Sequence, residues 1–488
     1  MKVFLTLKNA LFNVFYYKVL LIFFLVPTIL VPCITFDYKL LFIMMGWGAV
    51  ICLYDLFKRR NFLKARGMIW LIPFLVIFLV SVLLNFKTVF NLNVSSWAYS
   101  VIALLLLYPD SSGSKEKALK ELSVLNNIFI GVTAVLSTIS IGMFVVGYFK
   151  AVEYGDLIYD IGWNPYKHRL FGLYSNTGYM ITSIALAMII VQAVVTKTRS
   201  IKARGIYKAF LIYTAVVNFI CAALENAKGA FISLCAFLVV FFFAATLKKL
   251  KDKNKHGFGA FLTSTICGLL AAVVFVGGVY AVRPVLSFVP GLYQSVFGSD
   301  SGDMDADELE SIEMDRDIPE KYGFLTGRTI IWKFGLSEFK NKPIFGYGPQ
   351  SHREYKVVDI GLRHFHNIVV QSLVSVGIAG SIFVLGFFLT VLWFMFKSLI
   401  RLFKENDRFY SLSAALFAII IMFIVNGMAE VTILFLPRIS MFLFWLFMGY
   451  LNIFLGGENN TLGTKLLSKL DLFLEKILSR KAALKNEK

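Results

Sequence analysis

The segment that organises this chain runs from Gly327 to Gly380 and reads GRTIIWKFGLSEFKNKPIFGYGPQSHREYKVVDIGLRHFHNIVVQSLVSVGIAG. Polar side chains gather in it, whereas long apolar runs lie before and after it. It holds three of the five histidines of the chain, His352, His364 and His366. A polar segment between apolar runs indicates a functional loop that connects membrane-spanning helices.

The composition of the whole chain is that of a polytopic membrane protein. Of its 488 residues, 58% are hydrophobic and 16% are charged, and the mean hydropathy is +0.72. A soluble domain is far less apolar. The net charge of +19 would suit a nucleic-acid partner, but the lysines and arginines cluster in short loops between apolar runs, as membrane topology requires. We therefore expect no nucleic-acid partner. The five cysteines lie in apolar runs without metal-ligand spacing.

The apolar runs divide the chain into membrane spans. A hydrocarbon core of roughly 30 Å needs about 20 apolar residues per helix, which gives about 12 spans here. Lysine- and arginine-rich loops alternate with loops poor in them, so both termini are expected in the cytoplasm. The expected spans lie near residues 19–36, 40–57, 68–86, 94–108, 124–148, 177–195, 209–224, 230–247, 258–282, 377–396, 410–425 and 439–454.

The predicted fold is an all-α polytopic membrane protein with a large extracytoplasmic loop before the last three spans. Residues 1–282 would form nine transmembrane helices, and residues 283–376 the extracytoplasmic loop, with short helices and the catalytic segment. Residues 377–456 would form the last three spans. Residues 457–488 place leucines at helical spacing among lysines, which predicts an amphipathic cytoplasmic tail.

The first part of the outward loop, residues 303–320, is strongly acidic. A calcium-binding EF-hand loop needs glycine at its sixth position and glutamate at its twelfth. Counted from Asp303, these positions hold Glu308 and Met314. A solvated acidic surface is therefore favoured over a calcium site.

A short amphipathic helix is predicted to follow Gly327 and to end before Pro343. Arg328 lies at its start, where a cation is unfavourable for the helix. The planar guanidinium of Arg328 suits a phosphate or carboxylate ligand, and an ion pair with the acidic run is the alternative. The apolar residues at helical spacing are Ile330, Ile331, Trp332, Phe334 and Phe339.

Gly346 and Gly348 flank Tyr347 and are followed by Pro349. Glycines in this arrangement predict a tight turn that lets the backbone approach a neighbour closely. The pattern by itself is weakly specific.

His364 and His366 are the most suggestive polar pair of the segment. A metal site would need a third ligand, and none is evident nearby in the sequence, so no metal is predicted. His366 is the preferred hydrogen-bonding or proton-transfer group, because it borders an apolar helix. A histidine that caps this helix, or that sits at the membrane interface, is the alternative.

Three further polar residues are expected at the outer ends of spans: Arg169, Lys228 and Glu430. Polar groups at membrane depth are costly and usually line a cavity. The alternatives are that Lys228 extends to the membrane interface and that Arg169 and Glu430 form ion pairs. With the 327–380 segment, the three would form a cationic, outward-facing pocket.

The order of Gly327-Arg328, the run from Pro343 to Gly348, His366-Asn367 and the run from Val376 to Gly380 resembles the O-antigen ligase and polymerase superfamily. The resemblance is densest over residues 327–380 and extends to much of the second half of the chain. It implies a C-type glycosyltransferase that uses polyprenyl-diphosphate-linked glycans at the outer face of a bacterial cytoplasmic membrane.

The resemblance also implies roles for individual residues. The arginine of the family's GR pair and the histidine of its HN pair correspond to Arg328 and His366, and Glu430 is a further catalytic candidate. Lys228 stands where the family usually has an arginine. Arg328, Lys228 and Arg169 would bind the diphosphate, without a metal or other cofactor. The supporting residues would be Asn367, Gly346, Gly348 and His364.

These residues predict a polysaccharide polymerase that transfers a lipid-linked glycan onto a lipid-linked repeat unit of a capsule, exopolysaccharide or O-antigen. The alternatives are a ligase that moves the finished glycan to another acceptor, and a transporter or flippase of such lipids. The expected partners are the polyprenyl-diphosphate-linked oligosaccharide and membrane lipids. A flippase and a chain-length regulator of the same pathway are candidate protein partners.

Overall fold

The computed structural model describes residues 10–25, 30–59, 61–109, 111–154, 157–174, 180–200, 204–297, 327–351, 356–357, 360–361 and 364–456. The acidic run 303–320, His352 and the tail 457–488 lie outside the described residues. The predicted roles of these three parts stay predictions.

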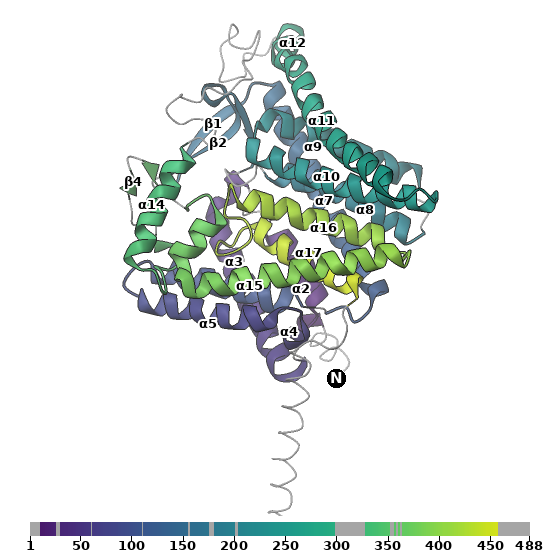
Figure 1. Ribbon diagram of the computed structural model, residues 1–488. Helices are drawn as coiled ribbons and strands as arrows, with labels where there is room; N and C mark the ends of the chain where they lie inside the picture. Colours follow the sequence, from purple (N-terminus) through teal and green to yellow (C-terminus); the bar gives the residue numbers. More distant parts are fainter. Residues whose placement is uncertain are drawn as a thin grey trace, which may run out of the picture.

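Most described residues lie in helices that run along one common direction (Figure 1). Within the described residues, nine helical segments are long and apolar enough to cross a membrane, and α2, α5 and α17 are shorter apolar helices. The helices of the first half are α2 (Val14–Leu25), α3 (Ile34–Tyr54), α4 (Asn61–Lys64), α5 (Met68–Leu84), α6 (Phe90–Ile102), α7 (Lys115–Val145), α8 (Ile181–Thr198) and α9 (Gly205–Glu225). Those of the second half are α10 (Lys228–Asp252), α11 (Phe258–Ser287), α12 (Val289–Phe297), α14 (Arg328–Asn341), α15 (Ile368–Lys404), α16 (Tyr410–Gly427) and α17 (Ile439–Leu455).

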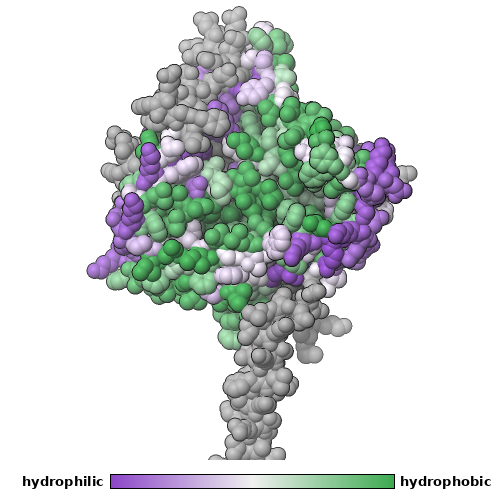
Figure 2. Space-filling model, viewed as in Figure 1, coloured by the Kyte–Doolittle hydropathy of each residue, from purple (hydrophilic) through white to green (hydrophobic). Residues whose placement is uncertain are grey.

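The distribution of surface polarity is that of a multi-pass membrane protein. Figure 2 shows hydrophobic side chains over the middle of the helices and hydrophilic side chains gathered at both helix ends. The exposed apolar residues of α11 illustrate this, because Val273 and Val274 are each 65% exposed in the middle of the helix. Such a band is stable only where lipid replaces water. The predicted fold class is confirmed by these helices.

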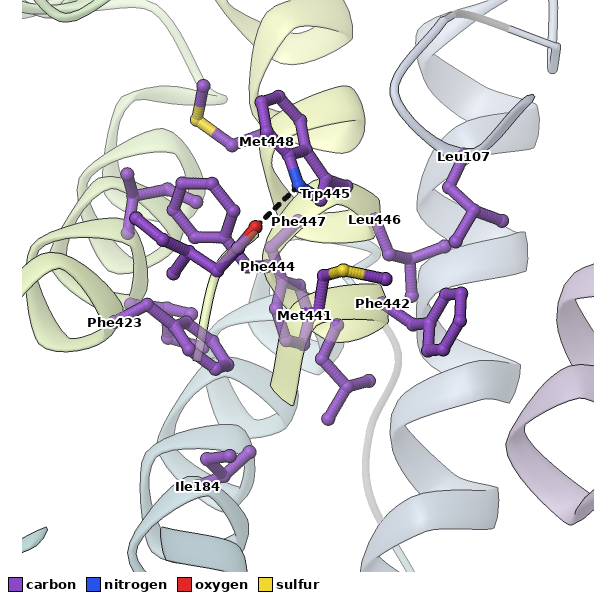
Figure 3. Close-up of a cluster of buried hydrophobic side chains, with 14 of the residues drawn as sticks. Leu107, Ile184, Phe423, Met441, Phe442, Phe444, Trp445, Leu446, Phe447 and Met448 are labelled. Carbon is purple, nitrogen blue, oxygen red and sulfur yellow. Dashed lines mark hydrogen bonds between the residues drawn. The ribbon is translucent and has the colours of Figure 1, made fainter. Parts of the chain in front are cut away.

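The core of the bundle lies around α17. Its residues from Ile439 to Tyr450 are buried, as expected for a helix that is apolar on every side. The indole of Trp445 donates a hydrogen bond of 2.8 Å to the carbonyl oxygen of Ile433. Figure 3 marks this bond at Trp445 with a dashed line. This bond satisfies the one polar atom of the ring, and it fixes the non-helical segment between α16 and α17. That segment carries Glu430.

Helix bounds differ from the expected spans at several places; for example, α7 begins at Lys115, ahead of the expected start of its span at residue 124. The first apolar helix ends at Leu25, and Pro32 lies in a short 3-10 turn before α3, so the expected span 19–36 is not one helix. Helix α15 begins at Ile368, ahead of the expected start of its span at Gly377. The helix is interrupted at Gly377, where φ is 63° and ψ is −169°.

A small antiparallel sheet of β1 (Phe149–Tyr154), β2 (Leu157–Asn164) and β3 (Arg169–Gly172) was not predicted. A second pair, β4 (Lys356–Val357) and β5 (Ile360–Gly361), is also antiparallel. The first sheet follows α7 and packs against the end of α9, next to the candidate site. Strands this short leave no signal in an analysis based on membrane-length apolar runs.

Candidate functional site

The candidate site is centred on the carboxylate of Glu430, whose side chain is 28% exposed. Its Oε1 accepts from Arg328 Nη2 at 3.2 Å and lies 2.8 Å from His366 Nδ1. Its Oε2 lies 3.6 Å from His364 Nε2 and 3.8 Å from Arg438 Nη1. Each carboxylate oxygen therefore faces one histidine and one arginine.

Arg328 reaches Glu430 because helix α14 is anchored on α15. The apolar face of α14, including Trp332 and Phe334, packs on a cluster that contains Phe365 and Val370. This confirms the predicted amphipathic helix and places its first residue, Arg328, at the site. The guanidinium is partly buried, with 24% of the side chain exposed. The packing of the apolar face of α14 therefore holds the guanidinium of Arg328, a bidentate hydrogen-bond donor, in one position.

The two histidines are held by complementary hydrogen bonds. The backbone N–H of His366 donates to His364 Nδ1 at 3.2 Å, so the proton of the neutral His364 ring lies on Nε2, toward Glu430. His366 presents Nδ1 to the carboxylate, which favours a proton on that nitrogen. The Nε2 atom of a neutral His366 is then an acceptor, as a general base requires.

Asn367 fixes this arrangement at the start of α15. Its side-chain oxygen accepts from the backbone N–H groups of Val369 and Val370, so it is the N-cap of the helix. Its side-chain amide donates to the carbonyl oxygen of Met428 at 3.0 Å. Asn367 thereby ties the histidine segment to the Glu430 segment. The cap of α15 is Asn367 and not His366.

Gly346 and Gly348 form the predicted close turn, and the turn meets the break in α15. The backbone N–H groups of Tyr347 and Gly348 donate to the carbonyls of Val374 and Ser375. In return, Ile378 and Ala379 donate to the carbonyls of Pro343 and Ile344.

Where a helix is interrupted within an apolar run, some backbone N–H and C=O groups lose their hydrogen-bond partners, which costs free energy. The turn at Gly346 supplies hydrogen bonds to these groups. A Cβ on Gly377 would lie 2.1 Å from the carbonyl oxygen of Ile344, so only glycine fits there. Two of the supporting residues, Gly346 and Gly348, thus lie in the turn that holds the broken helix.

Lys228 is the first residue of α10 and is exposed. The following Gly229 lies against the Glu430 segment, since a Cβ on Gly229 would be 3.8 Å from the Cβ of Ala429. Arg169 lies at the other side of the same turn and donates from Nε to the carbonyl oxygen of Glu225 at 2.6 Å. The carboxylate of Glu225 accepts from Thr182 at 2.7 Å. Arg169 therefore anchors the turn that carries Lys228.

The electrostatics of the site favour an ionised Glu430. Burial tends to raise the pKa of Glu430, but the charge and hydrogen bond of His366, with His364 and Arg438, together hold that pKa well below its usual range. A carboxylate with a lowered pKa is a poor proton acceptor at neutral pH. Glu430 is thus suited to orient cations and imidazoles.

Sequence reasoning missed Arg438, which is the N-cap residue of α17. A signal was available, because an arginine at the site end of a span departs from the pattern that places basic residues at the opposite end. Sequence reasoning also missed Glu225, because its carboxylate becomes meaningful only once Thr182 is folded against it.

His364, His366 and Glu430 could also hold a metal ion, since their ligand atoms lie within 4.8 Å of one another. Glu430 is the third ligand that the sequence did not reveal. The guanidinium of Arg328 already occupies the same carboxylate oxygen as His366. A divalent cation would meet this positive charge at close range, so the donor set fits a cation-binding role less well than an anion-binding one.

Part of the chain is similar to known proteins. Residues 213–385 match the family described as O-antigen ligase. This match supports a relationship of the chain to the O-antigen ligase/polymerase superfamily. It is also similar to the exopolysaccharide production protein ExoQ of Rhizobium meliloti (strain 1021), with 27% identity over 196 residues, which is 38% of this chain. The match covers 39% of the length of that relative.

The O-antigen ligase match contains most of the residues expected from the sequence, namely Lys228, Arg328, Gly346, Gly348, His364, His366 and Asn367. Arg169 lies before the match, and Glu430 and Arg438 lie after it. The fold brings Glu430 into contact with Arg328 and both histidines across this boundary, and Arg438 contacts Glu430.

Proposed function

We propose that this protein is a polysaccharide polymerase. It transfers a glycan from a polyprenyl diphosphate onto a lipid-linked repeat unit of a capsule, exopolysaccharide or O-antigen. The observation that carries the proposal is the meeting of Arg328, His366 and Glu430 at one end of a membrane bundle from the O-antigen ligase/polymerase superfamily. The printed name of ExoQ, an exopolysaccharide production protein, supports a role in polysaccharide synthesis.

The site lies on the outer face of the bacterial cytoplasmic membrane in this proposal, with both termini in the cytoplasm. Helices α10 and α15 both start at the site and end in lysine- and arginine-rich segments. Those basic ends lie together, because Lys251 donates to the carbonyl of Lys404 and Arg401 donates to the carbonyl of Gly456. Basic loops mark the cytoplasmic side, which supports an extracytoplasmic site.

Outside the cytoplasm the activated sugar must arrive attached to its lipid, and the leaving group is the lipid diphosphate. Arg328 and Lys228 stabilise the negative charge that develops on this group as the bond from the anomeric carbon to the diphosphate oxygen breaks. Arg169 contributes by holding the turn that presents Lys228. Cations held in fixed positions in a partly buried site can stabilise this charge without having to move during the reaction.

His366 takes the proton of the acceptor hydroxyl on Nε2 while the new glycosidic bond forms, and the proton then passes to water. Glu430 accepts from His366 Nδ1 and keeps the ring in the productive tautomer. His364 supports the same carboxylate from its other oxygen. Glu430 acts in catalysis through His366 and Arg328 in this proposal.

A reconstitution separates the polymerase from its nearest alternative. Purified protein in vesicles with only lipid-linked repeat units is expected to extend the glycan chain, because the repeat serves as both donor and acceptor. The measurement is the length distribution of the products on a gel. Activity only after another acceptor is added would identify a ligase, which the name of the matched family favours. Movement of intact lipid-linked glycan across the vesicle without transfer would identify a transporter.

Removal of divalent cations should leave the rate of polymer formation unchanged, since Arg328 and Lys228 supply the positive charge in this proposal. The rate is measured before and after treatment with a chelator, with magnesium and zinc added back in parallel. A rate that falls with the chelator and recovers with one metal would reject the cation-clamp mechanism. It would instead indicate the His364, His366 and Glu430 group as a metal site.

A further inference from the structure

Arg438 is a second arginine placed against the electrostatic preference of its helix. It is the N-cap residue of α17, where the helix dipole repels a cation. Its side chain has no oxygen atom that could accept a hydrogen bond from the first N–H groups of the helix. Arg328 stands in the same relation to α14, as its first residue. Both guanidinium groups lie at Glu430, Arg328 at Oε1 and Arg438 at Oε2.

Four helices begin around this carboxylate. Helix α10 begins at Lys228, α14 at Arg328, α15 after its cap Asn367, and α17 after its cap Arg438. Two of these starts are tied to the Glu430 segment, by the bond from Asn367 to Met428 and by the close approach of Gly229 to Ala429. Each helix start carries roughly half a positive charge, so the convergence adds to the field of the arginines.

The carboxylate of Glu430 marks the position of an anion between two guanidinium groups. Guanidinium groups bind carboxylate and phosphate with the same planar geometry. A diphosphate has two adjacent phosphates, and two arginines that flank one anion position from different helices can each bind one of them. The side chains of Arg328 and Arg438 are 24% and 21% exposed, so both stay reachable.

We propose that Arg438 binds the diphosphate of the lipid-linked donor together with Arg328, and that Glu430 holds both arginines in place while the donor is absent. The inference rests on the proposed function, because it assigns one more residue to the site that the donor occupies. Arg438 then contacts one phosphate and Arg328 the other. When the lipid diphosphate leaves, Glu430 forms its ion pairs with both guanidinium groups again.

The test is binding of farnesyl diphosphate to the full-length protein in nanodiscs, with Arg438→Gln and Arg438→Lys compared with wild type. Loss of one charged hydrogen-bonding partner should weaken binding by about tenfold to a hundredfold in Arg438→Gln. Arg438→Lys should recover part of the lost binding, because lysine keeps the positive charge but lacks the planar, bidentate guanidinium group. Farnesol, which lacks the phosphates, should bind all variants alike.

The matched control is Lys340→Gln, which removes one positive charge from an exposed position on α14. It should bind farnesyl diphosphate as wild type does. Equal binding by Arg438→Gln and wild type, with a loss in Arg328→Gln, would overturn the role of Arg438 and leave the proposed function standing.

Binding that survives in both single variants would reject the diphosphate site itself, and the proposed function with it. A loss of farnesol and farnesyl diphosphate binding alike in Arg438→Lys would also overturn the inference, since it would indicate a structural role.

Discussion

Replacing His366 by alanine is expected to lower the rate of polymer formation by about 10²- to 10⁴-fold, the usual contribution of a general base. The variant loses the only group that this proposal assigns to the proton of the acceptor hydroxyl. Glu430 is a poor substitute for the histidine as a base. Burial raises the pKa of Glu430, but His366, His364 and Arg438 outweigh burial and hold the pKa well below its usual range. The measurement is incorporation of labelled repeat units by reconstituted protein.

Two further variants separate chemistry from packing. His366→Asn keeps a side-chain N–H for Glu430 but has no basic nitrogen, so it should be as inactive as the alanine variant. His256→Ala, an exposed histidine outside the site, should be fully active. Normal polymer yield from His366→Ala, with normal membrane insertion, would remove His366 from the mechanism.

Replacing Arg328 by alanine is expected to reduce kcat by about 10²- to 10³-fold, as found when one donor to a developing negative charge is removed. The donor lipid should also bind more weakly, because the same guanidinium contacts its diphosphate before the reaction. Rates over a range of lipid-linked repeat concentrations give kcat and KM separately. Arg328→Lys should lie between the alanine variant and wild type.

The control for Arg328 is Lys333→Ala, which removes an exposed cation one turn along α14 and leaves the apolar face of the helix intact. It should keep the wild-type kcat and KM. The anchoring of α14 can be followed by the fluorescence of Trp332, which packs against the Phe365 cluster. An unchanged kcat in Arg328→Ala, with α14 still anchored, would contradict a role for Arg328 in charge stabilisation.

The membrane helices could be predicted because lipid imposes a simple length rule on apolar runs. The expected span at 439–454 is helix α17, and that at 410–425 is helix α16. The rule says little about how a helix is interrupted, so the start of α15 at Ile368 and its break at Gly377 were not predicted. It also says nothing of β1 to β3, whose strands are too short and too mixed in polarity.

The sequence predicted most residues of the candidate site, but it did not predict that they meet at the carboxylate of Glu430. Arg328 and His366 stood out because a cation at a helix start and a histidine beside an apolar run are unusual where they occur. Glu430 was expected in the same pocket, but its contact with both histidines was not. The contact of Arg438 with Glu430 was likewise not predicted, because the two residues become neighbours only when the segment before α17 packs against α16.

The class of the protein, its apolar helices, the amphipathic helix α14 and the identity of the charged residues in the 327–380 segment follow from the amino-acid sequence alone. These properties are local, since each depends on the spacing of side chains within one run. The meeting of Arg328, His364 and His366 at the carboxylate of Glu430 depends on tertiary packing. His366 and Arg328 lie 64 and 102 residues from Glu430 along the chain, so their contact depends on how α14, α15 and the segment before α17 pack together.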